Sequence, residues 1–417
     1  MPQLLNRPRA IEVMRREGLD GLAALMNHNV YYLSGYFGIL MRTNFDQHTA
    51  AVLPADEREP RALVTAAFDC RNVINADPPV ENVVIYTDEP ASPDRATPVR
   101  ATGAGGVTYN GWGTRPDAAL SPRQARWVQE TSRLTETTAQ SCVHGLIKAI
   151  KDAGLEKARI GIDDERLMRW LPELGLTQAT LVPAEPAFKE IRMVKTAPEI
   201  ELLRRAAMIN EAALLKARDS LRDGATWEEL ERIYMVEMAA NDARGIYLEC
   251  GNGGLQSGRV IKHEPVMFDA LGVYQGYHGD FGRSAVIGAP GRDVESRLKA
   301  LEAGWRAAYE TIRPGARYST VAAAVVAAVK KSDFAGSFRP PVVHSLGLQH
   351  TDDPAGRFDP PGKKPDRIIE ADMVLNVDLP HIEIGWGAIH IEDTVRVTKD
   401  GCEALTSMDT ALRILPA

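Results

Sequence analysis

The sequence predicts an α+β protein of two domains, a smaller α/β domain followed by a larger one with a mixed, mainly antiparallel and curved sheet. The length of 417 residues, 44% of them hydrophobic, favours two cores. Strand-like and helical stretches in the second half do not follow strict βαβ order, which favours antiparallel pairing. Between the halves a helix begins with Thr196 as N-cap, Pro198 just inside it and Glu199 in its first turn. We therefore predict domains at residues 1–192 and 193–417.

Hydrophobic periodicity and turn residues predict alternating helices and strands in the first domain. The segment 88–122 is rich in Pro, Gly, Ser and Thr, so we expect surface loops there. The predicted elements are helices at Arg7–Arg16 and Thr131–Ala153, strands at Gly21–Met26, Ala50–Leu53, Arg61–Thr65 and Ala158–Ile162, and a closing run at Leu181–Pro186.

The second domain is predicted to alternate long helices with apolar strands. Helices are expected at Glu199–Leu221, Trp227–Asn241, Arg292–Ile312 and Thr320–Lys331. Strands are expected at Val266–Gly272, Arg283–Gly288, Val374–Val377 and Ile389–Val397.

Composition and charge argue against several classes of function. A net charge of -7 and a pI near 5.8 leave no basic stripe for a phosphate backbone, so small molecules or peptides fit better than nucleic acid. The four cysteines are too widely spaced for a zinc motif or a disulfide framework. No run of about 18 apolar residues and no basic-then-apolar leader is present, so we expect a cytoplasmic protein without membrane contact.

A set of acids and one histidine in the second half predicts a metal site. Asp269 and Asp280 lie eleven residues apart around a glycine-rich turn, so a hairpin can bring both carboxylates to one end of a sheet. Asp378 and Glu392 each lie in an apolar strand, where a lone carboxylate is costly to bury without a positive partner. Each acid alone is most simply a surface acid or a salt bridge. Together with His344 they predict one or two divalent ions such as Mn, Co, Fe or Zn.

These residues resemble the metal ligands of the pita-bread metallohydrolases, which include methionine aminopeptidase, aminopeptidase P, prolidase and creatinase. The resemblance is specific from Lys189 to Val397 and extends to a creatinase-like N-terminal domain. The family's ligand order of Asp, Asp, His, Glu and Glu is matched in turn by Asp269, Asp280, His344, Asp378 and Glu392.

The resemblance also implies a mechanism and roles for individual residues. A metal-activated hydroxide is the expected nucleophile, because a bound metal lowers the pKa of its water. Asp378 is the expected base. His350, six residues after His344, matches the family's second histidine, which contacts substrate or shuttles a proton. Its simpler interpretation is a surface histidine beside two aspartates.

Three departures from the family's peptidases bear on the substrate. Asp378 stands where the family usually has Glu, His390 stands where proline-specific members carry arginine, and Leu248–Val260 holds no counterpart of the upstream substrate histidine. We therefore predict hydrolysis of a non-peptide C–N bond in a small carboxylated substrate, specifically an aromatic aminohydrolase of the 5-nitroanthranilate type. His390 would then contact substrate, and Arg283 or Arg42 would bind its carboxylate unless they form ordinary structural salt bridges.

Three other functions stay open: an Xaa-Pro dipeptidase or aminopeptidase, a lyase acting by proton abstraction, and a non-catalytic binding module. The last is disfavoured because a binding module has no need of five costly polar groups. The apolar stretch Asn27–Phe45 is most simply a helix packed in its own domain. Creatinase-like dimers suggest a second role, in which Tyr36, Phe37 and Arg42 line the partner's pocket in a homo-oligomer of two or more subunits.

Overall fold

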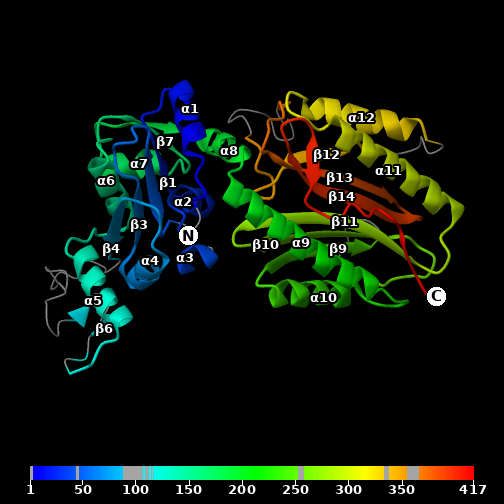
Figure 1. Cartoon of the computed structure of the whole chain (residues 1–417), viewed down its shortest axis with the longest axis horizontal. Coiled ribbons are helices and arrows are strands. Elements are labelled where there is room, and N and C mark those ends of the chain that lie inside the picture. The colour runs from blue at the N-terminus through cyan, green and yellow to red at the C-terminus, as the bar shows by residue number, and fades with distance from the viewer. Residues whose placement is uncertain are drawn as a thin grey trace. The chain divides into compact units, whose positions relative to one another are not determined.

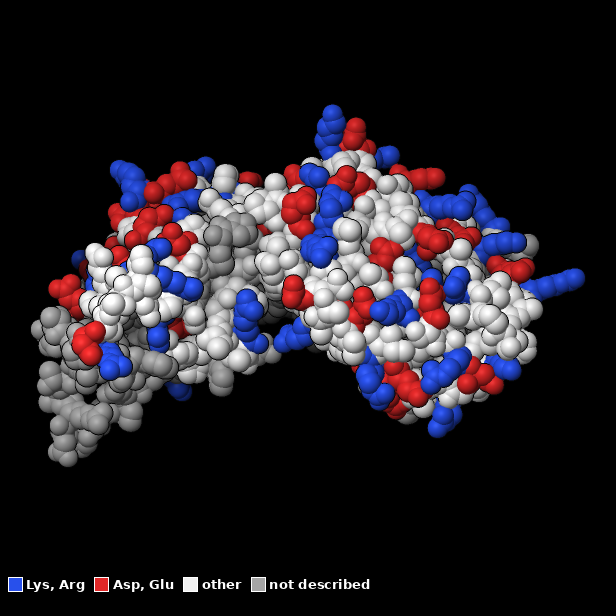
Figure 2. All heavy atoms as spheres, turned by 60° about the horizontal axis from the view of Figure 1, so that its bottom comes forward, with Lys and Arg blue, Asp and Glu red and all other residues white. Residues whose placement is uncertain are grey.

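The computed structural model describes residues 3–43, 47–87, 107–108, 112–113, 115, 117–251, 258–332, 338–354 and 366–417 (Figure 1). The chain forms two compact units, Met1–Ile191 and Arg192–Ala417. None of the helices in the described ranges is both long enough and apolar enough to cross a membrane. On the face drawn in Figure 2, basic and acidic side chains are interspersed rather than gathered by sign.

The first unit is built on a six-stranded mixed sheet in the order β4-β3-β2-β1-β7-β8. Its strands are β1 (Gly21–Ala24), β2 (Ala50–Pro54), β3 (Ala62–Ala66), β4 (Asn82–Tyr86), β7 (Arg159–Ile162) and β8 (Thr180–Pro183), and a separate pair is β5 (Val107–Thr108) with β6 (Trp112–Gly113). Its helices are α1 (Arg7–Glu17), α2 (Asn27–Ser34), α3 (Ile39–Arg42), the 3-10 turn η1 (Ala67–Asp69), α4 (Cys70–Ala76), α5 (Pro122–Leu134), α6 (Cys142–Asp152), α7 (Leu167–Glu173) and α8 (Glu185–Met193).

The long helix predicted at Thr131–Ala153 is wrong, because two helices occupy this part of the chain. Between α5 and α6, Ala139 leaves the helical path and forms a parallel bridge with Tyr86 beside β4. A new helix then begins because the Ser141 hydroxyl accepts a hydrogen bond from the backbone N–H of His144. Of the segment predicted as loops, residues 88–106, 109–111, 114 and 116 lie outside the described residues.

The second unit contains an eight-stranded sheet whose main path is β12-β13-β14-β11-β10-β9. All pairs on this path are antiparallel, and the edge strand β16 adds one parallel pair with β11. The strands are β9 (Arg244–Gly251), β10 (Val266–Tyr274), β11 (Tyr277–Ile287), β12 (Val342–Ser345), β13 (Val374–Glu383), β14 (Gly387–Val397), β15 (Cys402–Ala404) and β16 (Arg413–Leu415). The α+β class and the mainly antiparallel sheet are thus confirmed.

Four helices, α9 (Ala197–Asp219), α10 (Trp227–Ala240), α11 (Arg292–Thr311) and α12 (Tyr318–Lys330), pack on this sheet. The predicted start of α9 is confirmed, since Thr196 and Glu199 cap each other reciprocally. Figure 1 shows α9 and α10 beside β9, β10 and β11, and α11 and α12 beside β12, β13 and β14. The helices therefore divide the sheet into two halves, each with its own core.

Side chains alternate between the two faces of this sheet, and the helices cover one face. Phe268 of β10, Phe281 of β11, Val377 of β13 and Ile391 of β14 are buried in the cores that the helices complete. Their neighbours along each strand, Asp269, Asp280, Asp378, His390 and Glu392, therefore point to the opposite face. The fold gathers the candidate ligands on the face that the helices leave uncovered.

Candidate metal centre

Strand register aligns four candidate positions in one row across the sheet. Asp269 of β10 lies opposite Gly282 of β11, Gly282 lies opposite Glu392 of β14, and Glu392 lies opposite Asp378 of β13. The acids Asp269, Glu392 and Asp378, together with Gly282, thus lie side by side across four strands. We call this set of four residues the acid row.

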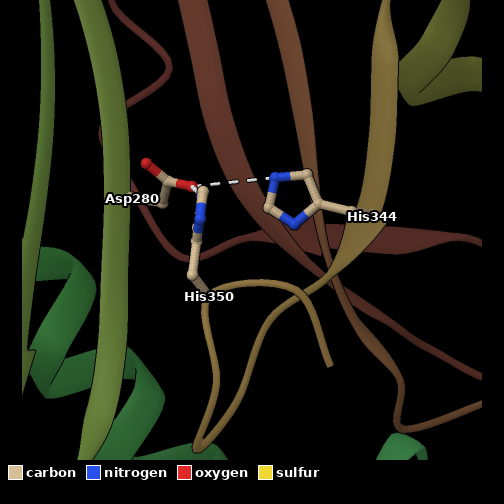
Figure 3. A group of neighbouring side chains, drawn as sticks. All are labelled: Asp280, His344 and His350. Carbon is tan, nitrogen blue, oxygen red and sulfur yellow. Dashed lines mark hydrogen bonds and ion pairs between the residues drawn. The ribbon is translucent and has the colours of Figure 1, made fainter. Parts of the chain in front are cut away.

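A second set of side chains meets next to the acid row. Asp280 of β11, His344 of β12 and His350 of the following loop have ligand atoms within 4.8 Å of one another. Both histidines point at the Asp280 carboxylate in Figure 3, with distances to its Oδ2 of 3.7 Å from His344 Nε2 and 2.9 Å from His350 Nε2. His344 is buried, whereas the His350 side chain is 43% exposed. The buried Asp280 and His344 therefore form the inner part of this group, and His350 lies on its solvent-accessible side.

The other group of ligand-type atoms within 4.8 Å consists of Asp269, His390 and Glu392. Nε2 of His390 lies 3.7 Å from Glu392 Oε2 and only 2.6 Å from Asp378 Oδ1. Among the described residues Asp378 joins neither three-residue group. It instead accepts a hydrogen bond from His390, a contact that the sequence did not predict.

Burial and crowding shift the pKa values of these groups in opposite directions. Burial, followed by repulsion from neighbouring acids, raises the pKa of Asp269 to about 7 and moves that of Glu392 well upward. Burial is the largest single effect on Asp378 and would raise its pKa, but the hydrogen bond from His390 together with the nearby charges of His390 and His344 lowers it. The hydrogen bond to Asp280 raises the pKa of His350, whereas burial lowers that of His344. The site concentrates negative charge that the protein itself only partly compensates.

Unpartnered atoms indicate what would compensate this charge. Asp269 Oδ1, Asp280 Oδ1 and Glu392 Oε2 are buried without a hydrogen-bond partner. Buried carboxylate oxygens without a donor are costly, and a divalent cation removes that cost. Carboxylates with imidazole suit transition metals such as Mn, Fe, Co and Zn. The donor set therefore fits a divalent metal.

Arg283 does not have the position of a substrate-binding residue, so that prediction is corrected. Its side chain is buried, and its Nη2 donates to Asp393 Oδ1 at 2.7 Å. Nη1 donates to the backbone carbonyls of Gly282 and Glu392, and Nε donates to that of Asp409. Because each of its nitrogens has a protein acceptor, Arg283 ties β11 to β14 behind the site.

The three residues predicted to reach a partner subunit differ in their surroundings. Tyr36 is 1% exposed, and its hydroxyl donates to Asp69 Oδ2 at 2.6 Å. Tyr36 is therefore a core residue of the first unit and does not line an open surface. Arg42 is exposed, and its guanidinium lies 5.2 Å from the centre of the half-buried Phe37 ring. For Phe37 and Arg42 the role at a partner's pocket stays a prediction.

Two further residues near the acids were not predicted. Strand β9 places Glu249 directly opposite Asp269, and it carries Tyr247 two residues away on the same face. Burial and the nearby Asp269 and Asp280 raise the pKa of Tyr247 above its ordinary range, so the phenol keeps its proton. Along β9 exposed and half-buried residues alternate over the first half and the second half is mostly buried, so the strand lacks a uniform period-two pattern.

A helix-backed antiparallel sheet with clustered carboxylates and imidazoles on its other face defines a metallohydrolase. Two family models match the chain: the metallopeptidase family M24 at residues 201–399, and the creatinase/prolidase N-terminal domain at residues 7–194. The chain belongs to the M24 family, as its resemblance to the pita-bread enzymes predicted. Members of this family use divalent metal ions.

Several relatives share a large part of the chain. The "Probable dipeptidase PepE" of Mycobacterium tuberculosis is 27% identical over 288 residues, which are 66% of this chain and 74% of that protein. The Xaa-Pro dipeptidase of Pyrococcus furiosus is 24% identical over 240 residues, 55% of this chain and 67% of that protein. Among solved structures, the Xaa-Pro dipeptidase from Bacillus anthracis has a TM-score of 0.70 at 17% identity, covering 98% of this chain and 100% of its own. At that identity the structural likeness shows the fold.

Proposed function

We propose that the protein is a metal-dependent dipeptidase. The observation that carries this proposal is the arrangement at Asp280, where a buried carboxylate and imidazole of the ligand type meet the half-exposed His350. Relatives over more than half of the chain are named as dipeptidases, which supports the same choice. Dipeptide hydrolysis therefore ranks above hydrolysis of a non-peptide C–N bond, the function that the sequence alone favoured.

The chain's own residues divide the work between holding metal and moving protons. Asp269, Asp280, His344 and Glu392 would hold a divalent metal, which would polarise the scissile carbonyl and lower the pKa of attacking water. Asp378 has a lowered pKa, so it stays ionised and can accept a proton. His350 has a raised pKa, so it keeps its proton to a higher pH than a free histidine and can deliver it to the leaving amine.

A second candidate is hydrolysis of a non-peptide C–N bond in a small carboxylated substrate, such as deamination of an aromatic amine. One observation favours it: His390 stands where proline-specific members carry arginine, and its side chain is fully buried against Asp378. The arginine, which is expected to hold the end of a peptide in those enzymes, is thus replaced by His390, which faces the candidate metal ligands. The metal chemistry is shared by both candidates, so substrates must distinguish them.

The deciding experiment is turnover by metal-stripped protein and by protein reloaded with Mn²⁺, with products read by mass spectrometry. One panel holds dipeptides with and without proline, and the other holds small carboxylated amines and amides. Metal-dependent cleavage of the dipeptide panel supports the proposal. Turnover of the second panel alone would replace it with the second candidate.

The variant His350→Asn tests the proton-delivery role on whichever panel reacts. We expect kcat to fall by about 10²-fold or more, the range that a general acid contributes, while metal content is unchanged. His263→Asn is the matched control, because His263 is exposed and has a positive φ that asparagine tolerates. Unchanged kcat in His350→Asn would remove this residue from the mechanism.

A further inference from the structure

His390 has a different environment from that of a substrate-binding residue. Its side chain is 0% exposed, so no substrate reaches it without rearrangement. Its backbone is fixed by Ser284, whose hydroxyl accepts from the His390 N–H at 2.7 Å and donates to the His390 carbonyl at 3.0 Å. The imidazole is therefore held on the ligand-bearing face of β14 by strand pairing.

The two ring nitrogens of His390 have different surroundings. Nε2 lies 2.6 Å from the carboxylate oxygen Oδ1 of Asp378, which can only accept, so Nε2 carries the hydrogen. Nδ1 is buried and has no hydrogen-bond partner. An imidazole fixed by a carboxylate through one nitrogen presents the lone pair of the other, which is the usual arrangement of a metal-binding histidine.

Gly282 determines where this lone pair lies. A Cβ atom built on Gly282 would collide with Nδ1 of His390, so the ring occupies the space that any other residue's side chain would fill. In the acid row Gly282 is flanked by Asp269 on one side and Glu392 on the other. Nδ1 therefore lies above the gap between these two acids.

Each of these three residues has one buried atom without a partner. The atoms are Asp269 Oδ1, Glu392 Oε2 and His390 Nδ1, and ligand atoms of the same three residues lie within 4.8 Å of one another. Asp378, one methylene shorter than the family's usual glutamate, is instead occupied with Nε2 of His390. Two acceptor oxygens and one ring nitrogen without partners therefore belong to three residues whose ligand atoms lie close together.

We infer that His390 is a metal ligand, which completes a position with Asp269 and Glu392 and is oriented by Asp378 as its hydrogen-bond partner. The prediction from sequence gave His390 to substrate and Asp378 to metal, whereas the geometry gives the ligand role to His390 and an orienting role to Asp378. Each of the two groups of candidate ligands then contains an imidazole. Such mixed nitrogen and oxygen donors favour transition metals over Mg²⁺ or Ca²⁺ at both positions. The inference does not depend on which substrate the enzyme cleaves.

Nitrogen coordination can be measured without any substrate. The metal-free protein, labelled with ¹⁵N-histidine, is loaded with Mn²⁺ and examined by pulsed EPR, and Mn²⁺ binding is measured in parallel by calorimetry. We expect His390→Gln to lose one class of ¹⁵N coupling and to weaken one equivalent of Mn²⁺ by about 100-fold or more. His344→Gln is the matched variant, since it removes an imidazole from the group around Asp280. It should lose the second class of ¹⁵N coupling and keep the one that His390 gives.

Two more variants separate His390 from Asp378. Asp378→Asn should keep every ¹⁵N coupling and weaken metal by about 10- to 100-fold, the effect of a partner that orients a ligand. Gly282→Ala keeps all candidate ligands but displaces the ring, so it should reproduce the His390→Gln spectrum. Circular dichroism in EDTA checks the fold of each variant.

The opposite pattern would overturn the inference. If His390→Gln or Gly282→Ala keeps the wild-type couplings and affinities while Asp378→Asn loses a full equivalent of Mn²⁺, then Asp378 is the ligand. Couplings from only one group in the wild type, when two equivalents are bound, would also exclude His390. Failure of the dipeptide assay would leave these results unchanged, so the two proposals fail separately.

Discussion

Two of the places where the second unit buries carboxylates differ in the partners that the protein supplies. Asp352 is fully buried, yet it accepts from Arg192 Nη2 at 2.6 Å and pairs with Lys195 Nζ at 3.2 Å. These cations lower the pKa of Asp352 against the effect of burial. At the acid row, Asp269 Oδ1 and Glu392 Oε2 are buried without a hydrogen-bond partner. A buried acid that has its own partners is structural, whereas one whose oxygens lack any partner indicates that a cation must come from outside.

The first unit shows that a raised pKa alone does not mark such a site. Burial raises the pKa of Asp163 to about 6, much as it raises that of Asp269. Asp163 nevertheless accepts hydrogen bonds from the backbone N–H groups of Leu25 and Met26 and from the amide of Asn29. The distinguishing property is the missing partner, and the pKa follows burial in both cases.

Removing the acid from the cluster of Asp352, Arg192 and Lys195, whose charges compensate one another, should give the largest effect on stability. Asp352→Asn leaves Arg192 and Lys195 buried without their acid, so we expect a loss of about 3–5 kcal/mol in the free energy of unfolding. Urea denaturation measures it, and the loss should be equal with and without metal. Asp366→Asn, which alters an exposed acid paired with Arg317, is the control with little change. If the loss in free energy of unfolding depended on metal, Asp352 would be part of the metal centre and would not differ from the acid row.

Removing one of the candidate metal ligands should lower metal affinity instead. Asp280→Asn removes the carboxylate that His344 and His350 share, so Mn²⁺ affinity should fall by more than about 100-fold and metal-dependent turnover should fall with it. Calorimetry and the dipeptide assay measure the two effects. Wild-type affinity in this variant would show that Asp280 is not part of the centre.

In the absence of metal, neutralising a buried acid should change the stability in opposite directions at the two places, with a loss at Asp352 and a gain at Asp269. Asp269→Asn removes a buried charge that has no partner, so in EDTA we expect a gain of about 1 kcal/mol, or about 2–4 °C in Tm. In saturating Mn²⁺ the same variant should be less stable than the wild type, because metal stabilises it less. Differential scanning calorimetry gives both values. A loss of stability in EDTA would mean that Asp269 has a partner in the protein.

The smallest expected effect is a pH dependence of the metal-free protein. Burial raises the pKa of Asp269 from 3.8 to about 7, so between these values the folded state keeps a proton that the unfolded state releases. The resulting stability is complete below about pH 4 and is lost as pH rises through about 7. We expect Tm in EDTA to fall over this range, and to fall less in Asp269→Asn. Equal slopes for the two proteins would assign the titration to other groups, such as Asp163 and Glu199.

Part of the candidate site could be proposed from the sequence because the relevant physics is local. Asp378 and Glu392 lie in apolar strands of period two, so an acid there either needs a partner or binds something. The spacing of Asp269 and Asp280 around a turn predicts a hairpin, and the structure has β10 paired with β11. Both features, together with the resemblance to a known family, can be read without knowing which strands are neighbours.

The remaining details depend on strand register, which spacing does not give. For Arg283 the choice between a substrate contact and a structural salt bridge stayed open, because its partner Asp393 lies 110 residues away on the neighbouring strand. His390 resembled a substrate contact because nothing in its own strand reveals Asp378 beside it on β13. Tyr36 belonged to an apolar stretch, but its hydrogen bond to Asp69 depends on tertiary packing. Contacts between strands decide which polar residues remain free.

The acid row draws its members from strands β10, β11, β14 and β13, which are separated by up to 123 positions along the chain. No hairpin or other local fragment of the second unit contains the whole centre. Pairings over such separations form late, because the intervening chain must be closed into loops first. High-affinity metal uptake should therefore begin only when the sheet is complete. In refolding experiments, binding of Mn²⁺ can time the last step of assembly, whereas helix signals report earlier ones.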